Sequence, residues 1–282
     1  MTSNDAQLQH QITSQVSLAL AEDIGAGDIT AQLIPSDETI KANVITREDA
    51  VLCGRAWVEE VFNQLDSSVE ITWHANEGDQ LSANQTIFSL SGNARSILTG
   101  ERCALNFVQS LSYTATIARE YASLVSETKL TVLDTRKTIP GLRLAQKYAV
   151  AVGGAQNHRV GLYDAFLIKE NHIMAAGSIH NAVSQAQTIA PGKTIEVETE
   201  SLDEVKQAVD AGADIIMLDN FSLSMMEEAV ERYGDKVKFE ASGNMTKQDL
   251  LDVANTGVDF VSVGALTKHV HAIDLSLRVV KD

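Results

Sequence analysis

Cysteine is scarce in this 282-residue sequence, and long apolar segments are missing from it. The two cysteines, Cys53 and Cys103, lie far apart and belong to no CxxC or Cys/His pattern, which argues against a disulfide framework and against a structural zinc site. No apolar stretch approaches the ~20 residues that span a bilayer, and the first ten residues lack the basic and apolar regions of an export signal. We therefore expect a cytoplasmic protein without a membrane segment.

Positive charge is also scarce. The chain has 22 lysines and arginines against 38 aspartates and glutamates, which gives a formal net charge of -16. Proteins bind nucleic acids through extended basic surfaces, because the phosphate backbone is repelled by acidic ones. The composition therefore argues against nucleic-acid binding.

The segment from Asp134 to His172 reverses this charge balance. A local group of cations can capture a small anion against the overall field of an acidic protein, so the segment indicates an anionic substrate. The alternative is that these cations decorate solvated helix faces, above all at Lys147. The cations are Arg136, Lys137, Arg143, Lys147, Arg159 and Lys169, and the acids are Asp134, Asp164 and Glu170.

Three of these cations follow apolar runs that predict buried strands. Arg136 and Lys137 come after residues 131–133, and Lys169 comes directly after residues 165–168. Because the ends of neighbouring parallel strands lie at one edge of a sheet, we expect these cations to converge on a cleft.

From about residue 130 onward, short apolar strands alternate with amphipathic helices, the pattern of a parallel α/β sheet. About six such units fit, which is too few for a regular eightfold barrel, so we expect an irregular, incomplete βα barrel over residues 113–274. The predicted strands are 131–133, 165–168, 194–197, 214–218, 237–239 and 260–263, and the predicted helices are 202–211, 225–233 and 248–256.

The first 112 residues show a different pattern, in which apolar and polar residues alternate in short segments bounded by turn signals. We expect an N-terminal α/β sandwich-like domain over residues 1–112, with residues 275–282 packing back on it. Because no low-complexity linker separates the two domains, we expect them to be closely packed. The predicted strands are 40–45, 69–73 and 87–90, and the predicted helices are 7–21 and 94–111, the second carrying Glu101, Arg102 and Asn106 on adjacent turns.

The predicted barrel strands end in charged residues or glycines, and active sites of βα barrels lie at these C-terminal ends. After two successive late strands, Gly243 and Gly264 would let backbone amides approach phosphate oxygens, with a favourable dipole from the following helix. The alternative is that these glycines only permit tight turns. The strand-end residues are Lys169, Glu198, Asp219, Ser242, Gly243, Asn244, Val263, Gly264 and Ala265.

Glu198 and Asp219 are candidates for a catalytic pair that faces the barrel interior. Glu196 alternates in phase with Glu198, and inward carboxylates need cations or a metal ion to neutralise them. We expect Lys169 and the arginines to be the counterions. The alternative is a structural layer of ion pairs, above all for Glu196. The spacing matches no tight metal motif, so Mg²⁺ is expected to arrive with a phosphorylated substrate.

Five sequence blocks carry a family resemblance. Through them the chain resembles the quinolinate phosphoribosyltransferases from Leu20 to about His269, without a departure at the expected site positions. The His-Arg and Thr-Arg-Lys blocks together are highly specific. The blocks are LAEDIGAGDIT at 20–30, DTRKT at 134–138, GGAQNHRVGL at 153–162, KENH at 169–172 and EVE at 196–198.

The resemblance implies transfer of a phosphoribosyl group from phosphoribosyl pyrophosphate to the ring nitrogen of quinolinate, with loss of the 2-carboxylate and with Mg²⁺ as cofactor, in NAD biosynthesis. It implies a homodimer and leaves higher oligomers open. By similarity, quinolinate is held by Arg136, His158, Arg159 and Lys169, with Arg102 from the neighbouring subunit, and Lys137 lies between the two substrates. Glu198 and Asp219 belong to the ribose and metal region, residues 242–244 and 263–265 to the 5′-phosphate, and Thr135 to the substrate-binding set, with Lys137, Lys169, Glu198 and Asp219 as the catalytic residues.

Three other interpretations stay open from the residues alone. An aldolase-type lyase could use Lys169 as a Schiff-base lysine. A related phosphoribosyltransferase could act on another heteroaromatic acid, because acid specificity depends on a few cations. A ligand-sensing or structural protein could retain the phosphate site, although inward carboxylates and a cationic pocket are costly without a substrate.

Overall fold

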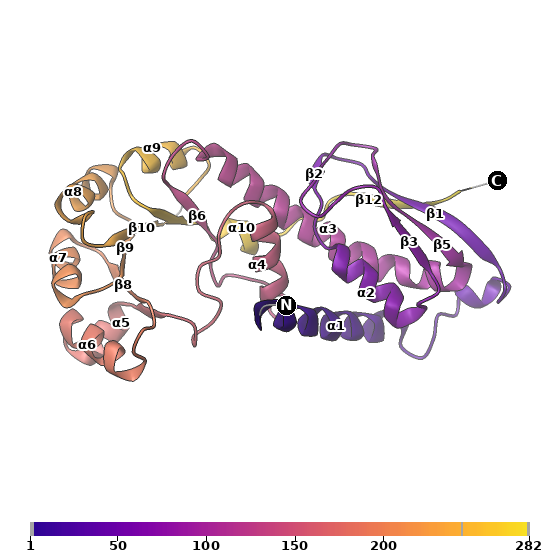
Figure 1. Cartoon of the computed structure of the whole chain (residues 1–282), viewed down its shortest axis with the longest axis horizontal. Helices are drawn as coiled ribbons and strands as arrows, with labels where there is room; N and C mark the ends of the chain where they lie inside the picture. The colour runs from indigo at the N-terminus through magenta and orange to yellow at the C-terminus, as the bar shows by residue number, and fades with distance from the viewer. Residues whose placement is uncertain (1–2, 244, 281–282) are drawn as a thin grey trace. The chain divides into compact units, whose positions relative to one another are not determined.

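The computed structural model describes residues 3–243 and 245–280, which pack into two compact units (Figure 1). The first, here called the sheet unit, comprises Met1–Arg119, Thr138–Gly154 and Thr267–Asp282. The second, here called the barrel unit, comprises Glu120–Lys137 and Ala155–Leu266. The expected α/β fold class, with an N-terminal sheet domain and an irregular barrel, is confirmed.

The sheet unit is built on a four-stranded antiparallel sheet in the order β12-β1-β5-β3. All three predicted strands are present, and the C-terminal strand β12 pairs with β1 along the edge of this sheet. A second, two-stranded sheet joins β2 to β4. The strands are β1 (Thr39–Thr46), β2 (Ala50–Val51), β3 (Glu70–Trp73), β4 (Gln80–Leu81), β5 (Thr86–Asn93) and β12 (Leu275–Val279).

Helices complete the apolar core of the sheet unit, in which Trp57, Phe62 and Phe88 are fully buried. The Trp57 indole Nε1 donates a hydrogen bond of 2.9 Å to Gln15 Oε1, so its one polar atom is satisfied inside the core. Gly54, at φ 114°, begins the helix of Trp57, and a Cβ there would lie 3.2 Å from the Val108 backbone. The helices are α1 (Ser3–Ile24), η1 (Ala31–Leu33), α2 (Arg55–Leu65) and α4 (Arg143–Val152).

Helix α3 (Ala94–Leu124) is longer than the predicted helix over residues 94–111. Leu111, Ala115 and Ala118 are all buried, so the apolar face continues past the predicted end. The passage from the sheet unit to the barrel unit falls within this helix, at Arg119 and Glu120.

The barrel unit holds a six-stranded parallel sheet in the order β6-β11-β10-β9-β8-β7. Strands β7 to β11 neighbour one another in chain order, and β6 lies beside β11. Figure 1 shows the sheet curving, with helices α5 to α9 on its outer side. The strands are β6 (Thr131–Leu133), β7 (Phe166–Ile168), β8 (Ile195–Thr199), β9 (Ile215–Asp219), β10 (Lys238–Ser242) and β11 (Phe260–Ser262), as predicted to within three residues.

The barrel helices begin at local sequence signals. Ser178, Ser201 and Ser222 each accept a hydrogen bond from the amide three residues further on, which caps helices α6, α7 and α8. No helix among the described residues combines the length and the apolar character needed to cross a membrane. The helices are α5 (Glu170–Ala176), α6 (Ile179–Ile189), α7 (Leu202–Ala211), α8 (Leu223–Tyr233), α9 (Asp249–Asn255) and α10 (Ala265–Lys268).

Candidate active site

A cavity of about 420 Å³ lies at the C-terminal ends of the barrel strands. The parallel sheet places all these ends at one rim, so residues distant in sequence meet there. Every barrel strand contributes, either from its last residues or from the residues that follow it. The lining residues are Thr135, Arg136, Lys137, His158, Arg159, Leu167, Lys169, Glu198, Met217, Asp219, Ser242, Gly243, Ser262 and Gly264.

Two arginines give one part of the cavity a concentrated positive charge. Partial burial, and next the neighbouring charge of Arg136, lower the pKa of Arg159. An Arg159 side-chain nitrogen, Nη1, donates to the Ala165 carbonyl oxygen at 3.1 Å, which fixes the direction of the guanidinium group. Like charges held close together repel, so an anionic ligand between them would relieve the repulsion.

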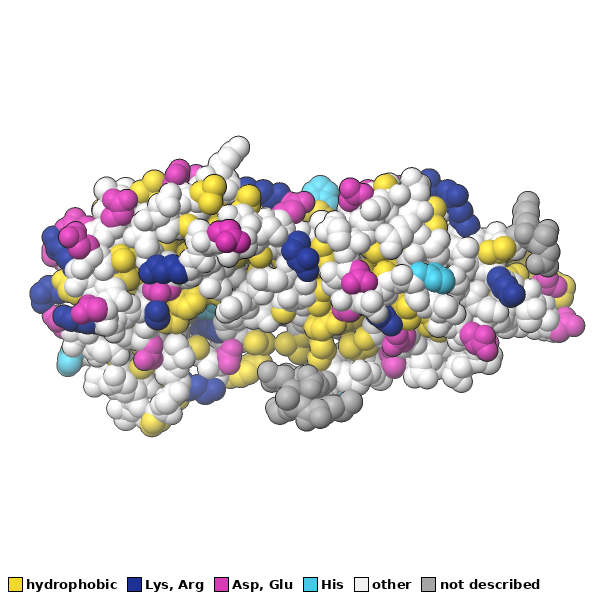
Figure 2. Space-filling view, turned by 45° about the horizontal axis from the view of Figure 1, so that its top comes forward, with side chains coloured by type: hydrophobic (Ala, Val, Ile, Leu, Met, Phe, Trp, Pro, Cys, Tyr) yellow, Lys and Arg dark blue, Asp and Glu magenta, His cyan; other side chains and the backbone are white. Residues whose placement is uncertain are grey.

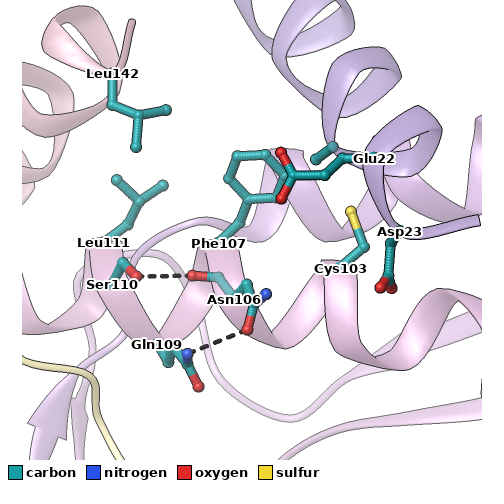
Figure 3. A pocket seen from close by; sticks show the side chains of 10 residues that line it. Glu22, Asp23, Cys103, Asn106, Phe107, Gln109, Ser110, Leu111 and Leu142 are labelled. Carbon is teal, nitrogen blue, oxygen red and sulfur yellow. Dashed lines mark hydrogen bonds between the residues drawn. The ribbon is translucent and has the colours of Figure 1, made fainter. Parts of the chain in front are cut away.

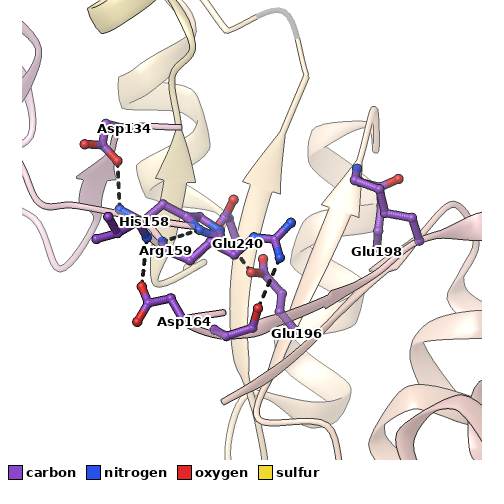
Figure 4. Close-up of polar contacts among 10 residues, drawn as sticks. Asp134, His158, Arg159, Asp164, Glu196, Glu198 and Glu240 are labelled. Atoms are coloured by element: carbon purple, nitrogen blue, oxygen red, sulfur yellow. Dashed lines mark hydrogen bonds and ion pairs between the residues drawn. The ribbon is translucent and has the colours of Figure 1, made fainter. Parts of the chain in front are cut away.

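The loop that carries Arg159 is anchored by a fully buried carboxylate. Asp134, with 0% of its surface exposed, accepts hydrogen bonds from Asn157 Nδ2 at 2.8 Å and from the His158 amide at 2.9 Å, the second of which is drawn in Figure 4. Further along, the Val160 amide donates to Asp164 at 2.8 Å. Asp134 therefore has a structural task, which is to hold the cationic loop against the end of β6.

Lys169, which follows β7, and Glu198, which belongs to the neighbouring strand β8, form an ion pair on the lining of the cavity. Lys169 also precedes helix α5, and its backbone amide donates to Nδ1 of His172 at 3.0 Å. The lysine side chain is 45% exposed and the glutamate side chain 16%. The expected pairing of Lys169 with an inward carboxylate is thus present, with both groups accessible to a ligand.

Asp219 lies at the end of β9 beside the first glycine loop. Its carboxylate accepts a hydrogen bond of 3.0 Å from Asn220 Nδ2, and Asn220 adopts a left-handed backbone conformation at φ 56°. A Cβ on Gly243, at φ 151°, would lie 3.1 Å from the Asn220 side-chain oxygen. The close approach of these two loops therefore requires glycine at position 243.

The second glycine loop, at Gly264, leaves room for the side chain of Lys137. A Cβ on Gly264 would come within 3.1 Å of the Lys137 side chain, and the Lys137 amide donates to Thr135 Oγ1 at 3.1 Å. The helix expected to follow each glycine is short or distant, since α10 has four residues and α9 begins only at Asp249. Support for a phosphate from a helix dipole is therefore smaller than the sequence predicts.

Below the cavity, Glu196 is paired with His158 rather than with Lys169 or an arginine. His158 Nε2 lies 2.9 Å from Glu196 Oε2 and 3.4 Å from Glu240 Oε2 (Figure 4). Burial lowers the pKa of His158, but hydrogen bonds and charges from the two glutamates outweigh it and raise the pKa to about 10. Burial also raises the pKa of Glu196. The three side chains therefore retain a proton that isolated groups would release near neutral pH.

Most of the site residues predicted from the sequence line the cavity, but some of the singled-out residues do not. Arg102, Arg143 and Lys147 belong to the sheet unit, and Asn244 lies outside the described residues. Lys147 is only 2% exposed, so the suggestion that it decorates a solvated helix face is wrong. Val263, which is buried, and Ala265 do not line the cavity either, although they flank Gly264 in the chain.

Three lining residues escaped the sequence analysis, namely Leu167, Met217 and Ser262. Each lies two residues before a strand-end residue that was singled out. Strand side chains alternate between the two faces with a period of two, so this spacing was the available signal. The face shown in Figure 2 carries lysines and arginines interspersed with acids rather than gathered into a continuous basic surface.

Both halves of the chain match models of a single family. Residues 28–112 match the N-terminal domain of quinolinate phosphoribosyl transferase, and residues 114–278 match its C-terminal domain. The chain belongs to the quinolinate phosphoribosyltransferase family. The two family domains meet between residues 112 and 114, whereas the packing of the chain changes units within α3.

Similar proteins of this family come from distant organisms. The "probable nicotinate-nucleotide pyrophosphorylase (carboxylating)" of Bacillus subtilis (strain 168) is 40% identical over 259 residues, covering 92% of this chain and 90% of the relative. A chloroplastic nicotinate-nucleotide pyrophosphorylase (carboxylating) of Arabidopsis thaliana is 38% identical over 291 residues, covering 96% and 83%. The solved nicotinate-nucleotide pyrophosphorylase of Francisella tularensis is 53% identical, with a TM-score of 0.94 and 96% of each chain covered.

Proposed function

We propose that this protein is a carboxylating nicotinate-nucleotide pyrophosphorylase of NAD biosynthesis. It transfers the phosphoribosyl group of phosphoribosyl pyrophosphate to the ring nitrogen of quinolinate and releases pyrophosphate, CO₂ and nicotinate mononucleotide. The observation that supports this best is the barrel cavity, which is lined both by cations for a dianionic acid and by carboxylates for a ribosyl donor. The family names carried by close relatives support the same reaction.

Quinolinate carries two carboxylates on a flat ring, and the cationic side of the cavity suits that shape. Guanidinium groups bind carboxylates through two parallel hydrogen bonds, so Arg136 and Arg159 are the proposed carboxylate ligands. Lys169 adds a third positive charge from the end of β7. Together they hold the acid with its ring nitrogen facing the ribosyl donor, which makes the transfer effectively unimolecular.

Glu198 and Asp219 lie on the donor side. As pyrophosphate leaves, positive charge develops at the anomeric carbon of the ribose, and nearby carboxylates stabilise that charge. The two residues also fit Mg²⁺, because they offer hard oxygen donors at adjacent strand ends and the substrate supplies the remaining oxygens. When bound, the ion would offset the negative charge of the pyrophosphate group. Lys137, whose side chain lies beside Gly264, would contact the donor phosphates.

Decarboxylation follows from the chemistry of the intermediate. Once the ring nitrogen is bonded to ribose it carries positive charge, so the ring can accept the electron pair left when CO₂ departs. A proton then replaces the carboxylate on the ring carbon. The cationic side chains would hold the acid in place and exclude water during this step.

The active form in this proposal is a homodimer in which Arg102 of one subunit reaches the acid site of the other. Arg102 is exposed on α3, in the sheet unit. The next residue, Cys103, lines a second cavity of about 370 Å³ together with Phe107, Leu111 and Leu142 (Figure 3). An exposed arginine beside an open, largely apolar recess is a surface that a second subunit could cover.

One assay tests the reaction. Purified protein is incubated with phosphoribosyl pyrophosphate, Mg²⁺ and either quinolinate or nicotinate, and nicotinate mononucleotide and CO₂ are measured. The proposal expects product only with quinolinate, with equal amounts of CO₂. Product with nicotinate alone would indicate a phosphoribosyltransferase for another acid. Absence of product with both acids, combined with borohydride trapping of a carbonyl compound on Lys169, would indicate the aldolase instead.

A further inference from the structure

Below the cavity, His158, Glu196 of β8 and Glu240 of β10 meet inside the barrel (Figure 4). One potential ligand atom from each residue lies within 4.8 Å of the other two. Glu196 and Glu240 precede the cavity residues Glu198 and Ser242 by two positions, so strand alternation places them one layer deeper in the same interior. Neither glutamate is part of the cavity lining. The substrate-binding roles proposed above therefore give these two residues no task.

The burial of Glu240 is costly to the fold. It has 0% of its surface exposed, and apart from a long contact with His158 Nε2 neither of its carboxylate oxygens has a hydrogen-bond partner among the described residues. Its only described ionic contact is with His158 Nε2, at 3.4 Å. An apolar side chain of similar size would pack there at lower cost, because a buried carboxylate is disfavoured unless it is well paired. The contact with His158 is thus the one interaction that can explain a glutamate at this position.

Hydrogen bonding to the backbone determines where the His158 ring carries its proton. The Arg159 amide donates to Nδ1 at 2.7 Å, so Nδ1 presents a lone pair and the ring proton lies on Nε2. Nε2–H then points at Glu196 Oε2 and Glu240 Oε2. Because the Arg159 amide occupies Nδ1, the ring proton that faces the two glutamates is the one on Nε2.

The same hydrogen bond argues against a divalent cation among these three residues. A metal ion would need the lone pair of Nε2, and the ring would then carry its proton on Nδ1. That proton would face the Arg159 N–H, donor against donor, at 2.7 Å. A proton therefore fits the cluster better than a metal ion does.

The His158 ring links the buried carboxylates to the residue that the proposed function assigns to the acid. One nitrogen is held by Glu196 and Glu240, and the other receives the Arg159 amide. The charge of Glu196 also acts favourably on the Arg159 guanidinium, which Arg136 repels. Removing Glu240 would leave Glu196 as the one described acceptor for Nε2, so the ring would be held from one side only and the backbone at Arg159 would be held less firmly.

We propose that Glu240, acting with Glu196 through the His158 ring, is a positioning residue that fixes Arg159 for carboxylate binding. The proposal depends on the proposed function for the identity of the acid. Glu240 touches no substrate in this arrangement. Its effect is confined to the arginine side of the cavity and does not extend to the glycine loops that face the donor.

The test compares Glu240→Gln with Glu240→Leu in the full-length protein. The glutamine side-chain oxygen can still accept Nε2–H, whereas the leucine side chain cannot. We expect Glu240→Leu to raise the KM for quinolinate about tenfold and Glu240→Gln less than about threefold, with kcat and the KM for phosphoribosyl pyrophosphate within about twofold of the parent. Equal increases in both KM values, or unchanged values in both variants, would overturn the proposal.

A matched variant separates positioning from general loss of stability. Thr256→Val removes a buried hydrogen bond of 2.7 Å to the Val253 carbonyl at the end of α9, away from the cavity lining. We expect it to lower the melting temperature without changing either KM. Glu240→Gln should leave the melting temperature unchanged or raise it, because a buried carboxylate becomes an amide. A fall like that of Thr256→Val, with no selective change in the quinolinate KM, would indicate a structural role only.

A spectroscopic measurement remains informative even if the protein fails to turn over quinolinate. In protein with ¹⁵N-labelled histidine, a His158→Asn variant assigns the ring signals, and Nδ1 of His158 should resonate as an unprotonated nitrogen. In Glu240→Leu, Glu196 still accepts Nε2–H, so Nδ1 should stay unprotonated while the Nε2 signal shifts. A protonated Nδ1 in the parent, an unshifted Nε2 signal in Glu240→Leu, or a stoichiometric metal ion lost on Glu240→Gln would contradict the proposed role of the ring. Absence of turnover together with the expected ¹⁵N signal would fault only the proposed function.

Discussion

Both the sheet unit and the barrel unit bury an apolar core, but among the described residues only the barrel unit also buries carboxylates. Trp57, Phe62 and Phe88 fill the core of the sheet unit, and their burial supports folding without a link to the cavity residues of the barrel. The barrel unit buries Glu196 and Glu240 inside its sheet, where carboxylates oppose folding unless they are paired. Mutations in the two interiors should therefore affect different measurements, stability in the first and substrate binding in the second.

Trp57→Ala should give the largest effect on stability. It removes a fully buried indole that contacts the Tyr148 ring at 5.7 Å between centroids and donates to Gln15. We expect a loss of about 3–5 kcal/mol in the free energy of unfolding, measured in urea. The kcat/KM of the protein that stays folded should hardly change. A large loss of kcat/KM with normal stability would contradict the expectation that this core affects stability and not substrate binding.

Lys169→Ala should give the opposite pattern. It removes the partner of Glu198 and a charge for the acid, so we expect kcat/KM to fall about 100-fold with little change in melting temperature. Lys206→Ala is the matched control, because Lys206 pairs with Asp210 on the barrel surface at 2.6 Å. It should leave activity intact. Equal losses in both variants would point to a general effect of removing charge.

Arg102→Ala tests whether the sheet unit takes part in acid binding at all. If Arg102 serves the neighbouring subunit, its loss should raise the KM for quinolinate about tenfold while the KM for phosphoribosyl pyrophosphate stays the same. Mixing Arg102→Ala with Lys169→Ala subunits should restore about a quarter of the parent activity, because half the dimers are mixed and each has one intact site. No recovery after confirmed subunit exchange would refute the shared site.

The smallest expected effect is on the reactivity of Cys103, whose thiol lies in the apolar interior of the sheet unit. Burial, and next the charge of Asp23, raise its pKa to about 11 (Figure 3). Because the thiolate is the reactive form, alkylation by iodoacetamide at pH 8 should be slow and should accelerate as the pH rises toward 11. Mass spectrometry of the peptide measures this, with Cys103→Ser as the control. Rapid modification at pH 8 would show that the recess is more polar than described.

The sequence predicted where the barrel strands lie better than where they end. The strand predicted at 237–239 stops one residue before Glu240, yet β10 continues to Ser242. Likewise β8 runs to Thr199, two residues past its predicted end. Charged residues usually mark the end of a strand, so Glu240 was left outside its predicted strand. Glu196 lay inside its predicted strand and a layer of ion pairs was considered for it, but its partnership with Glu240 was not predicted.

Pairing within the site was only partly predictable. Lys169 does pair with Glu198, which follows from two adjacent strand ends. The partner of Glu196 is His158, and this depends on how Asp134 folds the loop back against β6. Lys147 was misplaced because a charged side chain on an amphipathic helix is usually exposed, and only tertiary packing buries it. Local sequence patterns located the charged site residues, but contacts between residues distant in sequence determined which of them pair.

The ion pair between Lys169 and Glu198 makes the occupancy of one half of the cavity depend on the other. An acid that takes Lys169 must compete with Glu198, and a donor or cation that takes Glu198 releases Lys169. Linkage requires the benefit to be mutual, so each ligand should tighten the binding of the other by the same factor. In the empty protein Glu198 occupies the lysine that the acid would bind, and Lys169 occupies the carboxylate that the donor or cation would bind.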